Sequence, residues 1–172
     1  ELRAISVLLG VIVNAGICVL LKGLMKDPRP ASAILPDFGM PSNHAQVATF
    51  LSTHGITFLW QECTMVHGAC WKPLLSAIAV GWTCLVAASR VYLGEHTRSQ
   101  VVVGSVVGAL LGSGWHLLYR RVLPMLRPMV HRSSLCRYFY VRETSRVRDV
   151  FAVEFEYFDG LSREERHGKR TA

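Results

Sequence analysis

The chain has 172 residues, of which 51% are hydrophobic and only 18% are charged, and its mean hydropathy is positive. This composition excludes an ordinary soluble domain and indicates a membrane protein. The formal net charge of +7 is concentrated outside the apolar stretches, where it favours attraction to membrane surfaces and phosphate groups. Because no basic segment is interleaved with aromatic residues, nucleic acid is not an expected partner.

Apolar stretches free of Lys, Arg, Asp and Glu recur along the chain. They cover residues 4–21, 45–60, 73–88 and 101–118. A helix of roughly 18 residues is about 27 Å long, close to the hydrocarbon thickness of a bilayer. We therefore expect an all-α fold, a polytopic transmembrane helical bundle with about four spans in this chain. The second stretch is short and carries Gln46 and His54; we expect it to be a span, and a buried helix in a soluble bundle is its alternative interpretation.

The stretches divide the chain into a membrane-embedded core, residues 1–125, and a basic C-terminal tail, residues 126–172. The tail segment 138–158 could form an amphipathic surface segment or a pair of short strands. The end of the tail, residues 162–172, is expected to be solvated and disordered. Since Glu1 stands almost directly before the first stretch, we expect that one or more spans precede it.

If the spans alternate in direction, residues 22–43 and 89–100 face one side of the membrane. Residues 61–72 and the arginine-containing tail then face the other side, which the positive-inside tendency makes cytosolic. Within the last span, Gly104, Gly108 and Gly112 recur every four residues. This spacing predicts close packing against another helix.

The first polar cluster, KGLMKDPRP, runs from Lys22 to Pro30. Lys22 is expected to end the first span, and Pro28 stops regular helix so that Arg29 lies on a loop. An ammonium and a guanidinium that converge on one spot would bind phosphate oxygens. Two interfacial anchors that only snorkel are the alternative interpretation.

The second cluster is Pro41-Ser42-Asn43-His44, directly before the second stretch. Either Ser42 or Asn43 could cap the helix that follows. The free backbone N–H groups and the positive dipole end of such a helix favour an anion. His44 would lie in the first turn and could donate or accept a proton.

In the third cluster, Ser89 and Arg90 end the third stretch and His96 follows before the fourth. Arg90 could hold a phosphate while His96 approaches phosphorus. A neutral imidazole is a nucleophile and an imidazolium is an acid, so two histidines allow covalent catalysis. The sequence offers no carboxylate cluster of the kind a divalent cation needs, and we expect neither a metal nor another cofactor.

Together the clusters read K-x6-RP, PSNH and SR-x5-H-x3-Q, and they resemble the signature of the type 2 phosphatidic acid phosphatase superfamily, K-x6-RP, PSGH and SR-x5-H-x3-D. The resemblance implies that His96 is the nucleophile, which forms a phosphohistidine, and that His44 protonates the leaving group. It also implies a set of residues that bind the phosphoryl group: Lys22, Arg29, Ser42, Asn43 and Arg90.

Two positions depart from that signature. Asn43 replaces the usual Gly and leaves the backbone donor available. Gln100 replaces the Asp that orients the nucleophile; its amide oxygen can accept the Nδ1–H of His96 but brings no negative charge. A weakened enzyme or a non-catalytic lipid-binding relative is therefore an alternative.

Longer segments narrow the resemblance. MPSNHAQ at residues 40–46, SRVYLGEHTRSQVVVG at 89–104 and YVRETSRVRDVFAVEFEY at 140–157 are similar to the eukaryotic dolichyldiphosphatases, in which Gln at the Asp position is usual. This implies a multi-pass enzyme of the endoplasmic reticulum membrane with a lumen-facing site. It would hydrolyse dolichyl diphosphate, a polyprenyl diphosphate lipid, to dolichyl phosphate and inorganic phosphate for protein N-glycosylation. Phosphatidate phosphatase is the nearest alternative enzyme.

Overall fold

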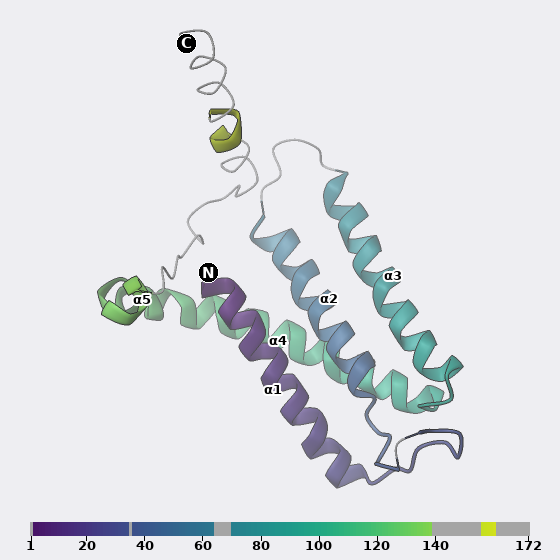
Figure 1. Ribbon diagram of the computed structural model, residues 1–172. Helices are drawn as coiled ribbons and strands as arrows, with labels where there is room; N and C mark the ends of the chain where they lie inside the picture. Colours follow the sequence, from purple (N-terminus) through teal and green to yellow (C-terminus); the bar gives the residue numbers. More distant parts are fainter. Residues whose placement is uncertain (1, 35, 64–69, 139–155, 161–172) are drawn as a thin grey trace, which may run out of the picture.

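The computed structural model describes residues 2–34, 36–63, 70–138 and 156–160 of the chain (Figure 1). Its helices are α1 (Leu2–Met25), α2 (Asn43–Gln61), α3 (Trp71–Tyr92), α4 (Arg98–Arg132) and α5 (Ser134–Tyr138), and residues 156–160 add a further helical turn. In the described part, extended pairing is confined to one isolated bridge between Pro28 and Phe38. The expectation of an all-α fold is confirmed.

Each predicted apolar stretch lies inside one helix, and every helix extends into flanking polar residues. α1 ends where Lys26 adopts a positive φ of 47°, the left-handed conformation that terminates many helices. Gly94, with φ 69°, follows the end of α3 in the same way. α4 begins with a capping box, in which Thr97 and Gln100 each accept the other's backbone N–H through their side chains.

Three helices of the described residues are long and apolar enough to cross a membrane, Leu2–Met25, Trp71–Tyr92 and the segment Arg98–Leu126. Three of the four expected spans are therefore supported, and the second, α2, is less apolar than these three. Figure 1 shows α2 between α1 and α3, with α4 starting beside the end of α3 and crossing α2 and α1; α2 contacts all three of these helices. A helix that is surrounded by other helices needs less apolar surface than one that faces lipid. The bundle can therefore accommodate the polar residues of α2, and whether α2 crosses the membrane stays a prediction.

Polar contacts inside the bundle explain the composition of α2. The buried Gln46 amide donates to the side-chain oxygen of Asn14 on α1 at 3.0 Å and to the backbone oxygen of Asn14 at 2.9 Å. The Ser52 hydroxyl lies 2.7 Å from that of Thr83 on α3. These bonds join α2 to two neighbours, because buried polar groups are stable where they are hydrogen-bonded.

The glycines of α4 bring its backbone against that of α2. A Cβ on Gly104 would lie 2.6 Å from the Ser42 carbonyl oxygen, and one on Gly112 would lie 2.7 Å from the Phe50 carbonyl oxygen. A Cβ on Gly108 would overlap the carbonyl oxygen of Gln46. The predicted close packing is confirmed, and it holds the start of α2 beside the start of α4.

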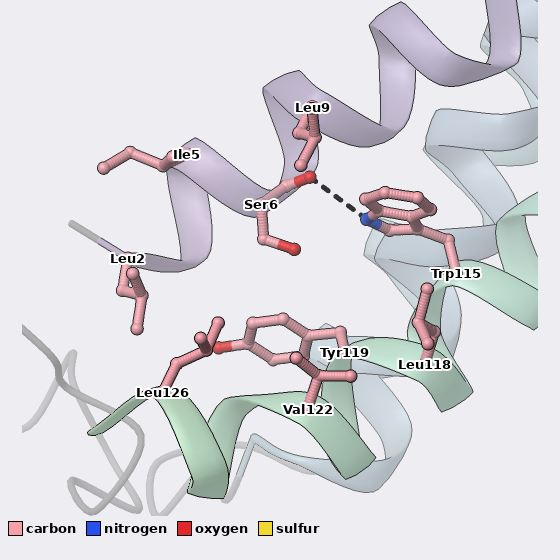
Figure 2. Close-up of a pocket in the computed structure, with 9 residues that line it drawn as sticks. All are labelled: Leu2, Ile5, Ser6, Leu9, Trp115, Leu118, Tyr119, Val122 and Leu126. Atoms are coloured by element: carbon pink, nitrogen blue, oxygen red, sulfur yellow. Dashed lines mark hydrogen bonds between the residues drawn. The ribbon is translucent and has the colours of Figure 1, made fainter. Parts of the chain in front are cut away.

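An apolar cleft of about 220 Å³ lies between α1 and α4 (Figure 2). Its lining comprises Leu2, Ile5, Ser6, Leu9, Trp115, Leu118, Tyr119, Val122 and Leu126. The Trp115 indole donates to the Ser6 carbonyl oxygen at 3.0 Å and closes one end of the cleft. This hydrogen bond joins the first half of α1 to α4.

α4 runs to Arg132, past residue 125, where we placed the end of the core. The tail segment expected to lie on the membrane surface falls mostly within residues 139–155, and the segment expected to be disordered falls at 162–172. Residues 139–155 and 162–172 lie outside the described residues, and residues 156–158 belong to the helical turn at 156–160. The division into core and tail stays a prediction.

Candidate active site

The polar clusters meet at one end of the bundle, where the α1–α2 connection (residues 26–42) contacts the α3–α4 connection (residues 93–97) (Figure 1). The Ser32 hydroxyl donates to the Gly94 carbonyl oxygen at 2.9 Å. The Ser42 backbone N–H donates to the Gln100 carbonyl oxygen at 3.0 Å. Segments far apart in sequence thus form one site.

A cavity of about 300 Å³ opens among these segments. Its polar lining includes Arg29, His44, Arg90 and His96, together with Glu95. The remaining lining residues are Ile34 and Leu93. Two imidazoles and two guanidinium groups therefore face one small volume.

Gln100 holds the His96 ring from behind. The amide oxygen of Gln100 lies 3.1 Å from His96 Nδ1 and accepts the Thr97 N–H at 3.1 Å. Its Nε2 donates to a carboxylate oxygen of Asp27 at 2.7 Å and to the Pro28 carbonyl oxygen at 2.9 Å. Because both of those oxygens are acceptors, the orientation of the amide is fixed by its partners.

That orientation determines the tautomer of His96. Since the Gln100 oxygen faces Nδ1, the neutral ring carries its hydrogen on Nδ1 and its lone pair on Nε2. His96 is 3% exposed and Gln100 is fully buried. A Cβ on Gly39 would lie 2.6 Å from the Gln100 amide carbon, so the glycine at this position lets the loop close on the amide.

Both histidines of the cavity favour the neutral form. Burial lowers the pKa of His96, and the charges of Arg29 and Lys22 lower it further, against opposing hydrogen bonds to Gln100 and to the Gly39 backbone. Burial likewise lowers the pKa of His44, and the nearby charge of Arg90 acts in the same direction. A neutral imidazole with a lone pair directed away from its hydrogen-bond partner can attack an electrophile.

Two carboxylates organise the cations of the first cluster. Asp37 forms ion pairs with Lys22, at 3.0 Å, and with Arg29. Arg29 also pairs with Glu95 at 3.1 Å, across the two connections. Arg90, whose Nε lies 3.3 Å from the Ser89 hydroxyl, contacts no carboxylate in the described part of the chain. Its guanidinium therefore leaves the cavity with an uncompensated positive charge.

Ser42 and Asn43 lie where α2 begins. Ser42 occupies the N-cap position, but its hydroxyl makes no capping hydrogen bond. That hydroxyl is buried and has no partner among the described residues. The Asn43 side chain is exposed in the first turn. The capping role considered for Ser42 is therefore wrong, whereas the phosphate-binding roles of both residues stay predictions.

The structure thus places four of the predicted residues on the cavity: Arg29, His44, Arg90 and His96. Gln100 contacts His96, and Lys22 lies outside the cavity lining and pairs with Asp37. Sequence reasoning missed Asp27, Asp37, Gly39 and Glu95. Asp27 lies inside the KGLMKDPRP cluster and Glu95 directly precedes His96. Carboxylates among cationic residues of a proposed phosphate site were the signal that could have identified them.

Comparison with known families agrees with this arrangement. The model of the PAP2 superfamily matches residues 3–123. The chain belongs to the PAP2 superfamily. That match includes all three polar clusters, α1 from residue 3 onward, and α2 and α3 entirely.

Several curated proteins are similar along most of their length. Dolichyldiphosphatase 1 of Homo sapiens is 33% identical over 164 residues, which cover 90% of this chain and 69% of the relative. Dolichyldiphosphatase 1 of Dictyostelium discoideum is 29% identical over 168 residues, which cover 95% of this chain and 72% of the relative. Lipid phosphate phosphatase gamma of Arabidopsis thaliana is 30% identical over 165 residues, which cover 91% of this chain and 71% of the relative. No solved structure matches the chain significantly.

Proposed function

We propose that this chain is a membrane phosphatase that hydrolyses dolichyl diphosphate to dolichyl phosphate and inorganic phosphate. The observation that carries the proposal is the cavity in which His96, with its lone pair on Nε2, shares one volume with Arg29, Arg90 and His44. The names of the human and Dictyostelium relatives support the diphosphate as substrate. The activity would recycle the lipid carrier of protein N-glycosylation.

The first step forms a bond between Nε2 of His96 and the terminal phosphorus. The bond from that phosphorus to the bridging oxygen breaks, and its electron pair leaves with dolichyl phosphate. Arg29 and Arg90 balance the negative charge on the transferring phosphoryl oxygens. His44 can protonate the leaving oxygen, but dolichyl phosphate is already a good leaving group, so this proton matters less than it would for a monoester.

The second step releases the phosphate from the phosphohistidine. Water attacks phosphorus, the N–P bond breaks, and the electron pair returns to Nε2 of His96. Neutral His44 can accept the proton of the attacking water. Because the arginines supply the positive charge, the proposed reaction requires no metal ion.

The location of the cavity suits an amphiphilic substrate. The polyprenyl chain remains in lipid while the diphosphate reaches the end of the bundle where the connections meet. If the candidate spans α1, α3 and α4 cross the bilayer, this end lies near a membrane surface. We assign that surface to the lumen of the endoplasmic reticulum, in keeping with the charge distribution of the loops.

Phosphate release by the protein purified in detergent tests this proposal. Dolichyl diphosphate and phosphatidate are offered separately, with and without EDTA, to the wild type and to His96→Ala. We expect release that resists EDTA, prefers the diphosphate and falls by a factor on the order of 10³ or more in His96→Ala.

Two results would redirect the proposal. Preference for phosphatidate would favour the broader lipid phosphatase activity indicated by the name of the Arabidopsis relative. Absence of release from both lipids, by protein that melts cooperatively, would favour a non-catalytic lipid-binding protein.

A further inference from the structure

The amide of Gln100 joins His96 to a carboxylate that belongs to a different part of the chain. Asp27 lies two residues beyond the end of α1, and its Oδ2 accepts from Gln100 Nε2 at 2.7 Å. We propose that Asp27 is a positioning residue which, through Gln100, supplies the negative charge behind the nucleophilic imidazole of His96. This inference rests on the proposed function, in which His96 is the nucleophile.

The position of Asp27 is fixed by its own backbone. The Asp27 carbonyl oxygen accepts the Gly39 N–H at 2.7 Å, so both ends of the α1–α2 connection meet beside the amide. The next carbonyl, that of Pro28, accepts from the same Nε2 at 2.9 Å. Gln100 therefore has all of its amide donors directed at the segment that carries Asp27.

Among the carboxylates near the cavity, Asp27 is the one that faces Gln100. Asp37 pairs with Lys22 and Arg29, and Glu95 pairs with Arg29. In the described residues Asp27 makes no ion pair, and its side-chain hydrogen bond goes to the amide. Its charge therefore acts on His96 through two successive hydrogen bonds, from the Asp27 carboxylate to the Gln100 amide and from that amide to the imidazole. We call this arrangement the relay.

The relay would stabilise the positive charge that develops on His96 during the reaction. As Nε2 bonds to phosphorus, positive charge develops on the ring, and the Nδ1–H becomes a stronger donor to Gln100. Hydrogen bonds in a buried chain polarise one another, so the carboxylate stabilises this charge through the neutral amide. The charges of Lys22 and Arg29 oppose it, and Arg90, Glu95 and His44 face the same cavity as His96.

The relay can be tested by measuring kcat and KM in variants that change the Asp27 and Gln100 side chains singly and then exchange them. Asp27→Asn keeps the shape and removes the charge, and we expect kcat to fall by about 10- to 100-fold with KM changed by less than about twofold. Gln100→Asp alone puts two carboxylates side by side and should impair turnover similarly. The double variant restores one carboxylate and one amide, and we expect kcat to recover by about tenfold or more over either single variant.

The control for Asp27→Asn removes a carboxylate that lies far from the site. Glu62→Gln removes a carboxylate that pairs with Arg120 at 3.2 Å, at the opposite end of α2, and should leave kcat unchanged. Wild-type kcat in Asp27→Asn, or a double variant no more active than the single variants although all melt as the wild type does, would overturn the relay.

A second readout does not depend on turnover. The ring carbons of histidine are labelled with ¹³C, and the His96 resonance is assigned by its loss in His96→Gln. Removing the carboxylate should move the titration midpoint of His96 to lower pH, because the imidazolium loses a favourable charge. An unchanged midpoint overturns the relay whichever lipid is hydrolysed. A shifted midpoint in a protein that releases no phosphate supports the relay and contradicts the proposed function alone.

Discussion

At the scale of single residues, the site combines a buried histidine, the proposed nucleophile, with cations whose charge is partly compensated. His96 is almost fully buried, and Arg29 is held between Asp37 and Glu95. Burial disfavours the imidazolium, and the nearby cations add to that effect. The proposed nucleophile therefore stays in its neutral form over a wider range of pH than a histidine in water.

This environment gives an expected pH dependence. Because the pKa of His96 is lowered from 6.5, the neutral nucleophile persists below that pH. We expect the acidic limb of kcat/KM for dolichyl diphosphate to lie below pH 6.5, as measured by phosphate release from about pH 4.5 to 8. An acidic limb above pH 6.5 would contradict the proposal that His96 is the nucleophile.

The variant Lys22→Met separates the ionisation of the enzyme from that of the substrate. Removing the Lys22 charge should raise the pKa of His96, so the acidic limb should move to higher pH even as the rate falls. A limb set by the substrate's own phosphate, which ionises near pH 6, would stay in place.

At the scale of elements, the contact between α2 and α4 aligns the two sides of the site. The glycines of α4 let the Ser42 carbonyl approach Gly104, one turn after Gln100. Ser42 donates its N–H to Gln100 within the same contact. The separation of these helices thus determines where the start of α2 stands relative to His96.

Two alanine substitutions on α4 test this contact. A Cβ on Gly108 would overlap the Gln46 carbonyl oxygen, whereas one on Gly114 would meet nothing within 4 Å. We expect Gly108→Ala to lower the free energy of unfolding by about 1–3 kcal/mol through overpacking. Gly114→Ala should be neutral or slightly stabilising, since Ala is the better helix former. Thermal unfolding in detergent compares them, and equal melting temperatures would contradict the close packing.

The sequence predicted the helices well because each depends on a local property, a run of apolar residues. Lys22 in the last turn of α1 and Arg90 in the last turn of α3 were also placed correctly. The bond between Asp27 and Gln100 could not be predicted, since it joins residues 73 positions apart through a loop of irregular shape. The same holds for the Arg29–Glu95 pair, 66 positions apart. Such contacts depend on how the connections fold over the helix ends.

At the scale of the whole molecule, the connections lie at two ends. Residues 26–42 and 93–97 meet at the site at one end, and α2 ends and α3 begins at the other (Figure 1). If the candidate spans cross a bilayer, these ends face opposite compartments. Our assignment places the site in the lumen and the α2–α3 connection in the cytosol.

Thiol labelling in sealed microsomes tests that assignment. Cys70, at the start of α3, is exposed, and we expect a membrane-impermeant maleimide to label it without detergent. Lys26→Cys, at an exposed position beside the site, should be labelled only after permeabilisation. Each thiol is tested in a variant that lacks the other cysteines. The reverse pattern would place the site in the cytosol.

The polar composition of α2 has a consequence for how the protein is made. α2 is not among the helices that are long and apolar enough to cross a membrane, and its Gln46 hydrogen-bonds to Asn14 of α1. As the chain leaves the ribosome, α2 emerges before α4, the helix with which it shares its closest backbone contact. During synthesis α2 must therefore be retained beside α1, by the insertion machinery or by α1 itself, until the glycines of α4 arrive to enclose it.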